Sequence, residues 1–598
     1  MNAEYLILTP IKLENICDSK FTFLSINLAP AELLASEIKN FEHYSSNIVE
    51  CNPILIEETY LLLLGRISLS LNSLHSIDLT ESQWETILGY WLINIVNGVS
   101  ERWEQLERIE SLDVSPIVCI GSRRTDFSPR FKSMEGKNFS EDHDFNSFVY
   151  EQLLSYFPSI RRKQFPGDTL GQTRGSSPSP TYSFTLPRFQ PGVRRTLKYA
   201  FLILSRRLRL KPNIFITASW IPKINYMWTS LFTRRLVFSS ENHFSKINSS
   251  PTRVDALSWL SAEKSESSFI RACIEIINQV IPSSLVEDFK ATLHAIEKAG
   301  LNYSPQLVIS NQHHCTGSDL QRIWFGIFGN NHNQLTIIQH GGTYGTYKFQ
   351  WAAYVEMRIS RVFMCWGWSA LDRSNNRILN TPALRLIKKR KARGDRKISS
   401  GKTLILLSPE PGYNSLYLPS QPYGPNEYLR YLYGILELIK TVDTKTSSKF
   451  CIRRQNHRNF LTSTFFTTFH PAISEESESQ LDFENWDLIV STYNGTNSLE
   501  CLLSGKPCIF YWDSNYASFT ELSAPIFKRL ENVGILHFTP ESAKAILEMS
   551  ENFRKEWWSS PEVTEAVTNF LTFFGNTNGG NLSFSKILSA QISSIDSI

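Results

Sequence analysis

The chain has 598 residues, of which 42% are hydrophobic and 20% are charged. This length is more than one hydrophobic core fills, so two or three domains are expected, and the composition excludes a disordered protein. The net charge of +4 is small for the length and no nucleic-acid-binding motif accompanies it, so no nucleic acid partner is expected. Nine cysteines without CxxC spacing fit a reducing cytoplasm better than a disulfide framework.

The first residues contain a strand-like run at Tyr5 to Thr9 but no basic region followed by a long apolar stretch, so a secretory signal is not expected. The longest apolar runs, such as 199–204, fall well short of the roughly 20 residues that a bilayer core requires. Cytoplasmic localisation is therefore expected. The basic stretch 194–211 can place the protein peripherally on the inner face of the cell membrane, although a solvated helix face is the more frequent explanation.

A long helical pattern follows the opening strand. Its apolar positions recur at helical spacing and predict core packing: Trp84, Ile87, Leu88, Trp91 and Ile95. The segment 165–192 is rich in Gly, Ser, Pro and Thr, which is typical of a loop excursion with some flexibility.

From Gln306 onward the pattern becomes α/β. Strands at 307–310 and 335–339 flank a helix at 320–328, and the stretch 388–402 is too charged and Gly-broken to be buried. A second unit then follows, with expected elements at 403–407 (strand), 428–439 (helix) and 450–453 (strand). Two α/β units joined by a charged linker predict two Rossmann-like domains that face each other across a cleft.

The clearest functional pattern lies between Asp487 and Asp513. The buried strand 488–490 should open into a crevice, where a polar turn meets the amino end of a helix that carries about half a positive charge. The turn supplies hydroxyl and N–H groups for an anion, most naturally a nucleotide phosphate, from Ser491, Thr492, Asn494, Gly495 and Thr496. An ordinary βαβ connection with a capped helix is the alternative.

The helix of this pattern carries Glu500, four residues after Thr496 and therefore on the same face. A carboxylate at that place suits a ribose diol. Gly505 and Pro507 should end the helix, because Gly accepts a left-handed cap and Pro cannot continue the hydrogen-bond ladder. The chain then returns into a strand at 508–512.

A second pattern, QHGGTYG, follows the strand at 335–339. Histidine at a strand end suits proton transfer, and adjacent glycines let a bulky ligand approach the backbone. His340 is therefore a candidate base, with Gln339, Gly341, Gly342 and Tyr344 facing an acceptor or the cleft. A tight turn with a hydrogen-bonded histidine is the alternative. Glu356 is a second candidate proton acceptor or an orienting partner for His340. Taken alone, it is expected to be a surface carboxylate.

Two weaker signals lie in the second unit. Arg453 and Arg454 end a strand, where an arginine fork can bind phosphate, with a structural salt bridge as the equal alternative. The turn with Ser408, Gly412 and Tyr413 should face the same crevice. His313, His314 and Cys315 are adjacent, which is poor spacing for a metal site, so no metal is expected.

Several motifs lie in order along the chain: LTESQWETILGYWL and ERWE near Thr80 to Glu104, QHGGTYG with the following Glu and CWGW at 339–368, STYNGTNSLECLLSGKPCIFYWD at 491–513, then GILHFTPESA and EWWSSPEV. With these motifs the chain resembles a family of transferases found in bacterial O-antigen and other surface-polysaccharide gene clusters. The tryptophan-containing motifs add specificity, because Trp is rare. The region 165–250 matches least.

The resemblance implies a glycosyltransferase with a GT-B-like fold. The broader group includes transferases of Kdo and sialic-acid-like sugars from CMP donors, and polyol-phosphate transferases whose His-Gly motif supplies a catalytic histidine. By this analogy His340 is the base or a leaving-group partner, while Arg453 and the Ser491–Thr496 turn hold the donor phosphate with Glu500 near the ribose. The family pattern Arg-Leu-Tyr-Pro-His is replaced here by RRQNH at 453–457, which leaves open which arginine faces phosphate.

The expected domains are an N-terminal Rossmann-like, acceptor-side domain with largely helical elaborations (1–387), the linker (388–402), a nucleotide-sugar domain (403–565) and a tail with helical potential (566–598). The leading hypothesis is transfer of a sugar, such as Kdo or a nonulosonate, from a CMP donor to a growing glycan or lipid-linked glycan, without a metal or other cofactor. Transfer of a polyol phosphate from a CDP donor is the related alternative. A sugar-binding or scaffolding protein without turnover is the third.

Overall fold

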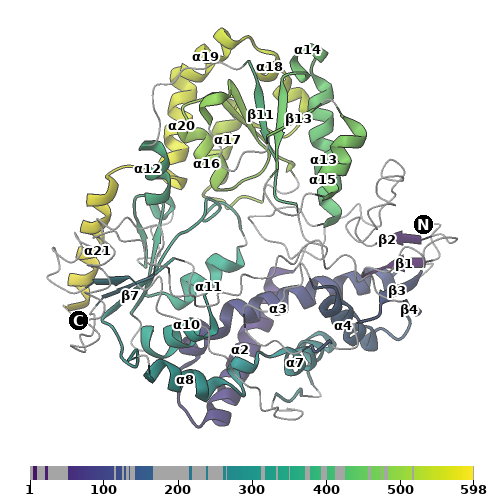
Figure 1. Cartoon of the computed structure of the whole chain (residues 1–598), viewed down its shortest axis with the longest axis vertical. Helices are drawn as coiled ribbons and strands as arrows, with labels where there is room; N and C mark the ends of the chain where they lie inside the picture. Colours follow the sequence, from purple (N-terminus) through teal and green to yellow (C-terminus); the bar gives the residue numbers. More distant parts are fainter. Residues whose placement is uncertain are drawn as a thin grey trace, which may run out of the picture.

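The protein is an α/β molecule with three parallel sheets, seen in a computed structural model (Figure 1). The structure describes residues 5–9, 21–23, 52–112, 116–123, 127–129, 134, 142–165, 214–217, 237–239, 260–263, 265–298, 300–311, 317–330, 334–348, 350–370, 377–391, 401–410, 425–454, 460–471, 473–476, 483–514 and 518–596. The predicted basic segment 194–211 and nearly all of the predicted excursion 165–192 lie outside these residues.

The N-terminal sheet has the order β2-β1-β3-β4, and all of its pairings are parallel. Its strands are β1 (Tyr5–Ile7), β2 (Phe21–Phe23), β3 (Ile117–Gly121) and β4 (Arg162–Phe165). We expected a largely helical elaboration here with one opening strand, so this sheet is an addition to the prediction. Its strands have three to five residues, too few for a periodic pattern to stand out in the sequence.

The helices of this region are α2 (Pro53–His75), α3 (Glu81–Glu110) and α4 (His143–Leu153), of which α4 packs against β3 and α2 packs against α3. A capping box starts α3, because the Thr80 hydroxyl accepts from the Gln83 N–H and the Gln83 side chain accepts from the Thr80 N–H. The five residues of the predicted apolar stripe on α3 are each at most 4% exposed. The prediction that they form core is confirmed.

The middle sheet has the order β10-β9-β8-β7-β5-β6. Its strands are β5 (Ile214–Ile216), β6 (Val237–Ser239), β7 (Leu307–Ser310), β8 (Leu335–Ile338), β9 (Val362–Cys365) and β10 (Ile378–Asn380). Helices of this region are α7 (Ser268–Val280), α8 (Phe289–Lys298), α10 (Asp319–Trp324), α11 (Trp351–Ile359) and α12 (Leu384–Lys391). Because α3 packs against both α10 and α11, the N-terminal helices and the middle sheet share one core.

The C-terminal sheet has the order β13-β12-β11-β14-β15-β16, again fully parallel. Its strands are β11 (Thr403–Leu406), β12 (Phe450–Arg453), β13 (Ser474–Glu475), β14 (Leu488–Ser491), β15 (Cys508–Tyr511) and β16 (Leu536–His537). Counted from β11, this is the doubly wound order 3-2-1-4-5-6, in which ligands bind beyond the carboxyl ends of the two strands where the order reverses. Those strands are β11 and β14.

The helices around this sheet are α13 (Pro425–Thr441), α14 (Thr444–Ser447), α15 (Phe460–Phe469), α16 (Thr496–Leu503), α17 (Ala524–Asn532), α18 (Pro540–Glu548), α19 (Glu551–Ser559) and α20 (Pro561–Phe574). Helix α16 ends just before Gly505, whose φ of 69° is left-handed. The prediction of a glycine cap at this position is confirmed.

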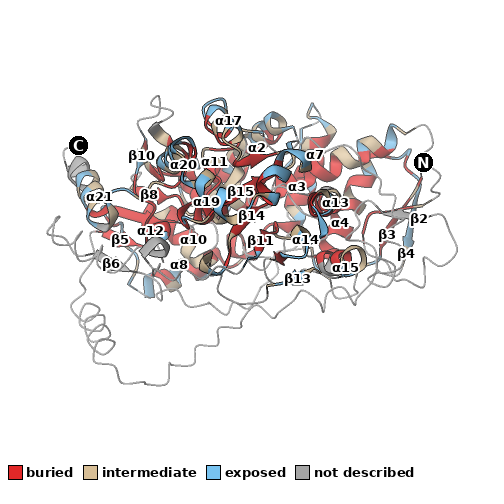
Figure 2. Cartoon of the chain, turned by 90° about the horizontal axis from the view of Figure 1, so that it is seen from above, coloured by how far each residue is buried: buried red, intermediate tan, exposed pale blue. Residues whose placement is uncertain are grey.

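The last helix, α21 (Gly580–Asp596), leaves the C-terminal sheet and lies beside the middle sheet (Figure 1). Its Phe584 and Leu588 are buried in a cluster with Ile214, Ile309 and Met364 of the middle sheet. Figure 2 shows the strands of the middle and C-terminal sheets as largely buried between exposed helix faces. No helix within the described ranges has the length and apolar character needed to cross a membrane.

Candidate functional site

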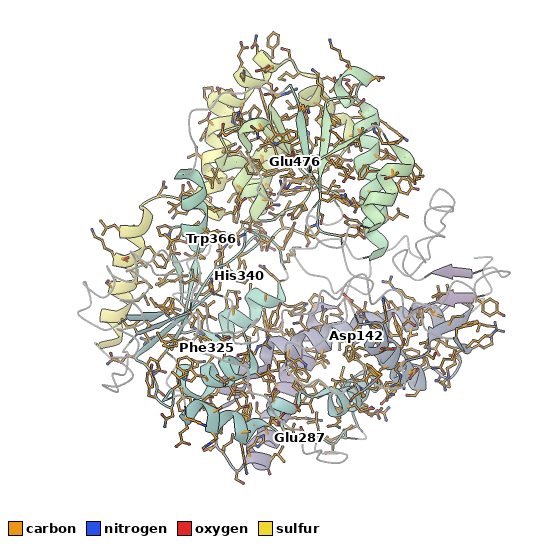
Figure 3. The ribbon with its side chains drawn as sticks, in the orientation of Figure 1. Asp142, Glu287, Phe325, His340, Trp366 and Glu476 are labelled. Carbon is orange, nitrogen blue, oxygen red and sulfur yellow. The ribbon has the colours of Figure 1, made fainter. Side chains whose placement is uncertain are left out.

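The QHGGTYG turn follows β8 at the end of the middle sheet that faces the C-terminal sheet, where His340 and Trp366 are labelled in Figure 3. Gln339, which we expected to face an acceptor, is fully buried. Its Oε1 accepts from the Trp366 N–H and from the Trp368 indole N–H, both at 2.9 Å, and its Nε2 donates to the Gly341 carbonyl at 2.7 Å. Gln339 therefore anchors the turn to the CWGW motif.

His340, Tyr344 and Glu356 form a connected cluster. The Tyr344 hydroxyl donates to Glu356 Oε2 at 2.8 Å and lies 3.0 Å from His340 Nδ1 and 3.4 Å from Nε2. His340 Nδ1 is 3.5 Å from Glu356 Oε1, and the histidine side chain is 25% exposed. The structure thus brings the two predicted proton-transfer residues together and places Tyr344 between them. Tyr344, which we expected to face an acceptor or the cleft, is 2% exposed.

Glu356 is a buried carboxyl, 1% exposed, on the inner face of α11. The expectation that it would by itself be a surface carboxylate was wrong, because α11 turns this residue toward Tyr344. Burial raises the pKa of Glu356 to about 7, against the opposing effects of the His340 charge and the Tyr344 hydrogen bond. A partly exposed histidine backed by a buried carboxyl is an arrangement that serves a general base.

The glycines of the turn touch the C-terminal unit directly. The Gly342 N–H donates to Thr496 Oγ1 at 3.2 Å, and a Cβ at Gly342 would lie 2.8 Å from backbone atoms of Gly495 and Thr496. The Asn494 amide donates to Thr346 Oγ1 at 3.1 Å. The close backbone approach that Gly342 permits is therefore used by the amino end of α16, which is the helix terminus we predicted as an anion site.

The polar side chains before α16 bind one another. Ser491 and Thr492 are fully buried; Ser491 Oγ lies 3.0 Å from Ser498 Oγ, and Thr492 Oγ1 donates to the Leu406 carbonyl at 2.6 Å. Glu500 is 5% exposed. In this arrangement these side chains build the turn and join it to β11. Their predicted role in holding a donor phosphate and ribose stays a prediction.

The two arginines at the end of β12 differ in their partners. Arg454 forms an ion pair with Glu475. Arg453 carries a buried Nη1 with no hydrogen-bond partner among the described residues, although the residue as a whole is partly exposed. Arg453 pairs in register with Leu406, so it stands beside the carboxyl end of β11. Arg454 therefore fits the predicted structural salt bridge. Arg453 has a donor that is available to bind a ligand.

The turn after β11 is described only in part. The Ser408 N–H donates to the Tyr431 hydroxyl at 2.8 Å, and its carbonyl accepts from the Tyr428 hydroxyl at 3.0 Å. Glu410 accepts from both the N–H and the hydroxyl of Thr462, at 3.0 and 2.8 Å. The predicted Gly412 and Tyr413 lie outside the described residues, as do the predicted 455–457.

Sequence reasoning missed one charged residue beside the histidine. Arg385, near the start of α12, is exposed, and its Nη1 approaches the His340 carbonyl at 3.4 Å. It stands 45 residues from His340 in a segment without a motif, so no local signal could have found it. Within the described ranges, no group of at least three His, Cys, Asp or Glu side chains is placed to hold a metal ion. His313, His314 and Cys315 are not among the described residues.

Residues 8–586 match the model of the LIC12162 family transferase. The chain belongs to this family. The match spans the His340 turn, Glu356, the CWGW motif and the strands β11 and β14. The protein is therefore a transferase, and the predicted resemblance to a transferase family is confirmed at that level.

Two other comparisons were made. No curated protein matches the chain at a significant level. Among solved structures, the crystal structure of a UDP-N-acetylglucosamine 2-epimerase is 10% identical and covers 65% of this chain and 97% of its own, with a TM-score of 0.34. A superposition this loose assigns neither a fold nor an activity to the chain.

Proposed function

We propose that the protein is a glycosyltransferase that moves a sugar, such as Kdo or a nonulosonate, from a CMP-activated donor to a hydroxyl of a growing surface glycan. The single observation that carries the proposal is the cluster of His340, Tyr344 and Glu356, in which a partly exposed imidazole is backed by a buried carboxyl. Transfer to a hydroxyl needs a group that takes the hydroxyl proton, and this cluster is built for that step.

In the proposed reaction the His340 imidazole removes the proton from the acceptor hydroxyl as its oxygen bonds to the anomeric carbon of the donor. The bond from that carbon to the nucleotide phosphate breaks, and the bonding electrons leave with the phosphate. The Glu356 carboxylate, 3.5 Å from His340 Nδ1, stabilises the imidazolium that forms. The proton stays on His340 until product leaves.

On the donor side, Arg453 is the best-supported phosphate ligand. Its buried Nη1 has no hydrogen-bond partner in the part of the chain that the structure describes, and the residue stands at the carboxyl edge of the C-terminal sheet, beside β11. An arginine that binds phosphate in a fork geometry neutralises the charge that develops on a departing nucleotide. Arg385, exposed beside His340, is a second cation placed to meet the carboxylate of a Kdo-type or nonulosonate sugar.

The proposal is tested by incubating the protein with CMP-linked Kdo or CMP-linked nonulosonate and a glycan acceptor, and measuring acceptor-dependent release of CMP. His340→Gln should lower the rate by at least about 10²-fold, the typical contribution of a general base. His294→Gln is the matched control, because the His294 side chain is 77% exposed on α8, and its rate should equal that of the wild type.

The outcomes separate the rival functions. Release of CMP from a CDP-linked polyol, with no release from either CMP sugar, would replace the proposal with polyol-phosphate transfer, since the same base serves both reactions. Absence of release with every donor, together with unimpaired glycan synthesis in cells that carry His340→Gln, would contradict turnover and favour a sugar-binding or scaffolding protein.

A further inference from the structure

The chain folds into a tight turn that begins three residues after His340. The Thr346 N–H donates to the Thr343 carbonyl at 3.2 Å, and Gly345 between them has a left-handed φ of 73°. Glycine adopts this conformation without strain, and the third position of a type II turn requires it. The second residue of the turn is Tyr344, which contacts His340. The conformation of this turn therefore influences where the histidine stands.

The hydroxyl of Thr346 joins this turn to the C-terminal unit. It donates to the Thr343 carbonyl at 2.5 Å and accepts from the Asn494 amide at 3.1 Å. The two bonds are compatible, because a carbonyl oxygen only accepts, an amide N–H only donates, and the single hydroxyl proton is used once. Thr346 is fully buried and Asn494 is 3% exposed. Removal of the hydroxyl would therefore leave the Asn494 amide without this acceptor in a buried place, which is costly.

The backbone of Thr346 is held by a second segment of the C-terminal unit. Its carbonyl accepts from the Thr520 N–H at 3.0 Å and lies 2.8 Å from Ser523 Oγ. The Lys348 N–H donates to the Ser518 carbonyl at 3.1 Å, so the two segments pair as a short antiparallel bridge. These bonds involve the backbone of residues 346 and 348, so the turn stays attached to the C-terminal unit when only the Thr346 hydroxyl is lost.

We propose that Thr346 is a positioning residue, whose hydroxyl holds the His340 turn in register with the polar turn 491–496 of the C-terminal unit. This inference rests on the proposed function, in which His340 takes the acceptor proton and the C-terminal unit binds the donor. Transfer requires the base and the donor at a fixed separation, and small misplacements lower the rate. Thr346 acts only through the backbone that carries His340 and through Asn494.

The test variant is Thr346→Val, because valine keeps the branched shape and removes the hydroxyl, and Thr346→Ser should rescue it because serine keeps the hydroxyl. A matched control lies in another contact. The Asn330 amide donates to the Thr86 hydroxyl at 2.9 Å, and that hydroxyl donates to the Ser82 carbonyl at 2.8 Å. Thr86 lies on α3 and is 2% exposed. Thr86→Val therefore removes the same kind of relay from a contact that does not involve the His340 turn.

The first readout needs no substrate. It is amide hydrogen exchange of the full-length protein, measured by mass spectrometry on peptides that cover 341–348. Exchange in this stretch should be about tenfold faster in Thr346→Val and return to the wild-type rate in Thr346→Ser, because loss of a buried hydrogen bond loosens the turn. Thr86→Val should leave it unchanged. Asn494→Ala removes the other end of the relay, should also speed the exchange, and decides the matter if Thr346→Val does not fold. Unchanged exchange in these variants overturns the inference.

The second readout is steady-state release of CMP from the CMP-linked donor at pH 8. Thr346→Val should lower kcat about tenfold with the donor KM unchanged, because a misplaced base slows the chemical step and not donor binding. Thr346→Ser and Thr86→Val should keep the wild-type kcat. Faster exchange with an unchanged kcat would show a purely structural contact and contradict the inference. A wild type that releases no CMP would instead refute the proposed function, and the exchange rates would still decide whether Thr346 holds the turn.

Discussion

Two buried carboxylates lie near helix α11, and they are held in different ways. Glu85 of α3, 3% exposed, accepts from the Tyr60 hydroxyl at 2.9 Å and from Arg358 Nε at 2.5 Å. Glu356 of α11, 1% exposed, accepts from the Tyr344 hydroxyl and lies 3.5 Å from His340 Nδ1. Both carboxylates accept from a tyrosine, and Glu85 also has a permanent cation as a partner.

We propose that this difference separates a structural carboxylate, Glu85, from one that takes part in the proposed reaction, Glu356. The two contacts of Glu85 join three helices, because Tyr60 lies on α2, Glu85 on α3 and Arg358 on α11. The Arg358 guanidinium keeps its charge at any relevant pH, so Glu85 always has a cation beside it. The partner of Glu356 is itself titratable, and burial raises the pKa of Glu356 to about 7. Perturbed groups of this kind are typical of sites that do chemistry.

The largest expected effect is on the pH dependence of transfer. Below about pH 7 Glu356 gains a proton and no longer stabilises the imidazolium, so kcat/KM should fall about tenfold per pH unit. Glu85→Gln should keep this acid limb, and Glu356→Gln should shift it to lower pH because the titrating carboxyl is gone. The profile is measured by CMP release between pH 5 and 9. Identical acid limbs in the wild type and Glu356→Gln would erase the distinction between the two carboxylates.

The second effect is on the free energy of unfolding, which should rise in Glu356→Gln and fall in Glu85→Gln. The pKa of Glu356 rises from 4.5 to about 7 on folding, so its contribution to stability falls as pH rises through this range and stays low above it. At pH 8 Glu356→Gln should therefore be more stable than the wild type, by at most about 3 kcal/mol. Glu85→Gln should be less stable by about 1 to 3 kcal/mol, because it leaves the partly buried Arg358 without its carboxylate.

Urea midpoints at pH 8 and pH 4.5 measure both variants. The gain in Glu356→Gln should be present at pH 8 and nearly vanish near pH 4.5, where the wild-type carboxyl is protonated in the folded chain and about half protonated in the unfolded chain. Loss of stability in both variants at pH 8 would mean that Glu356 is held as a structural carboxylate, like Glu85.

The third effect concerns how the turn that carries His340 is held. Gly342→Ala should destabilise the protein by about 1 to 3 kcal/mol, because its Cβ would lie 2.8 Å from the Gly495–Thr496 backbone. Gly341→Ala is the matched control, since its Cβ would lie 3.7 Å from Tyr344, an ordinary contact. Thermal melting compares the two. Equal melting temperatures would show that the turn and α16 are not packed together in solution.

The smallest effect concerns the two arginines at the end of β12, of which Arg454 is paired with a carboxylate and Arg453 is the proposed phosphate ligand. Arg454→Gln removes a partly exposed ion pair with Glu475 and should change stability by less than about 1 kcal/mol, with the donor KM unchanged. Arg453→Gln should raise the donor KM about tenfold or more, because its buried Nη1 has no hydrogen-bond partner among the described residues and is proposed to bind the donor phosphate. Steady-state kinetics with the CMP donor distinguishes them, and the reverse pattern would reassign the phosphate contact to Arg454.

Much of the local structure could be predicted from sequence. The strands at 307–310 and 450–453 have the predicted bounds, and the Gly505 cap follows from the conformational freedom of glycine. These features depend on neighbouring residues alone. The N-terminal sheet and the return of α21 to the middle sheet were not predicted, since they depend on contacts between segments far apart in the chain.

The candidate site also has features that the local sequence predicts and features that depend on tertiary packing. His340 could be identified because a histidine followed by two glycines at a strand end is a local pattern. Glu356 was named as its partner but expected at the surface when taken alone, because the sequence does not show which face of α11 turns inward. The bridging place of Tyr344 and the contact of Gly342 with α16 depend on tertiary packing, which single-sequence patterns do not report.

The most direct test of the central claim is the rate at which Glu356→Gln releases CMP from a CMP-linked donor in the presence of acceptor at pH 8, relative to Glu85→Gln. If Glu356 supports the base and Glu85 supports the fold, the rate of Glu356→Gln should be at least about 10²-fold lower while its fold is as stable as the wild type or more so. A Glu356→Gln rate equal to that of Glu85→Gln would contradict the account.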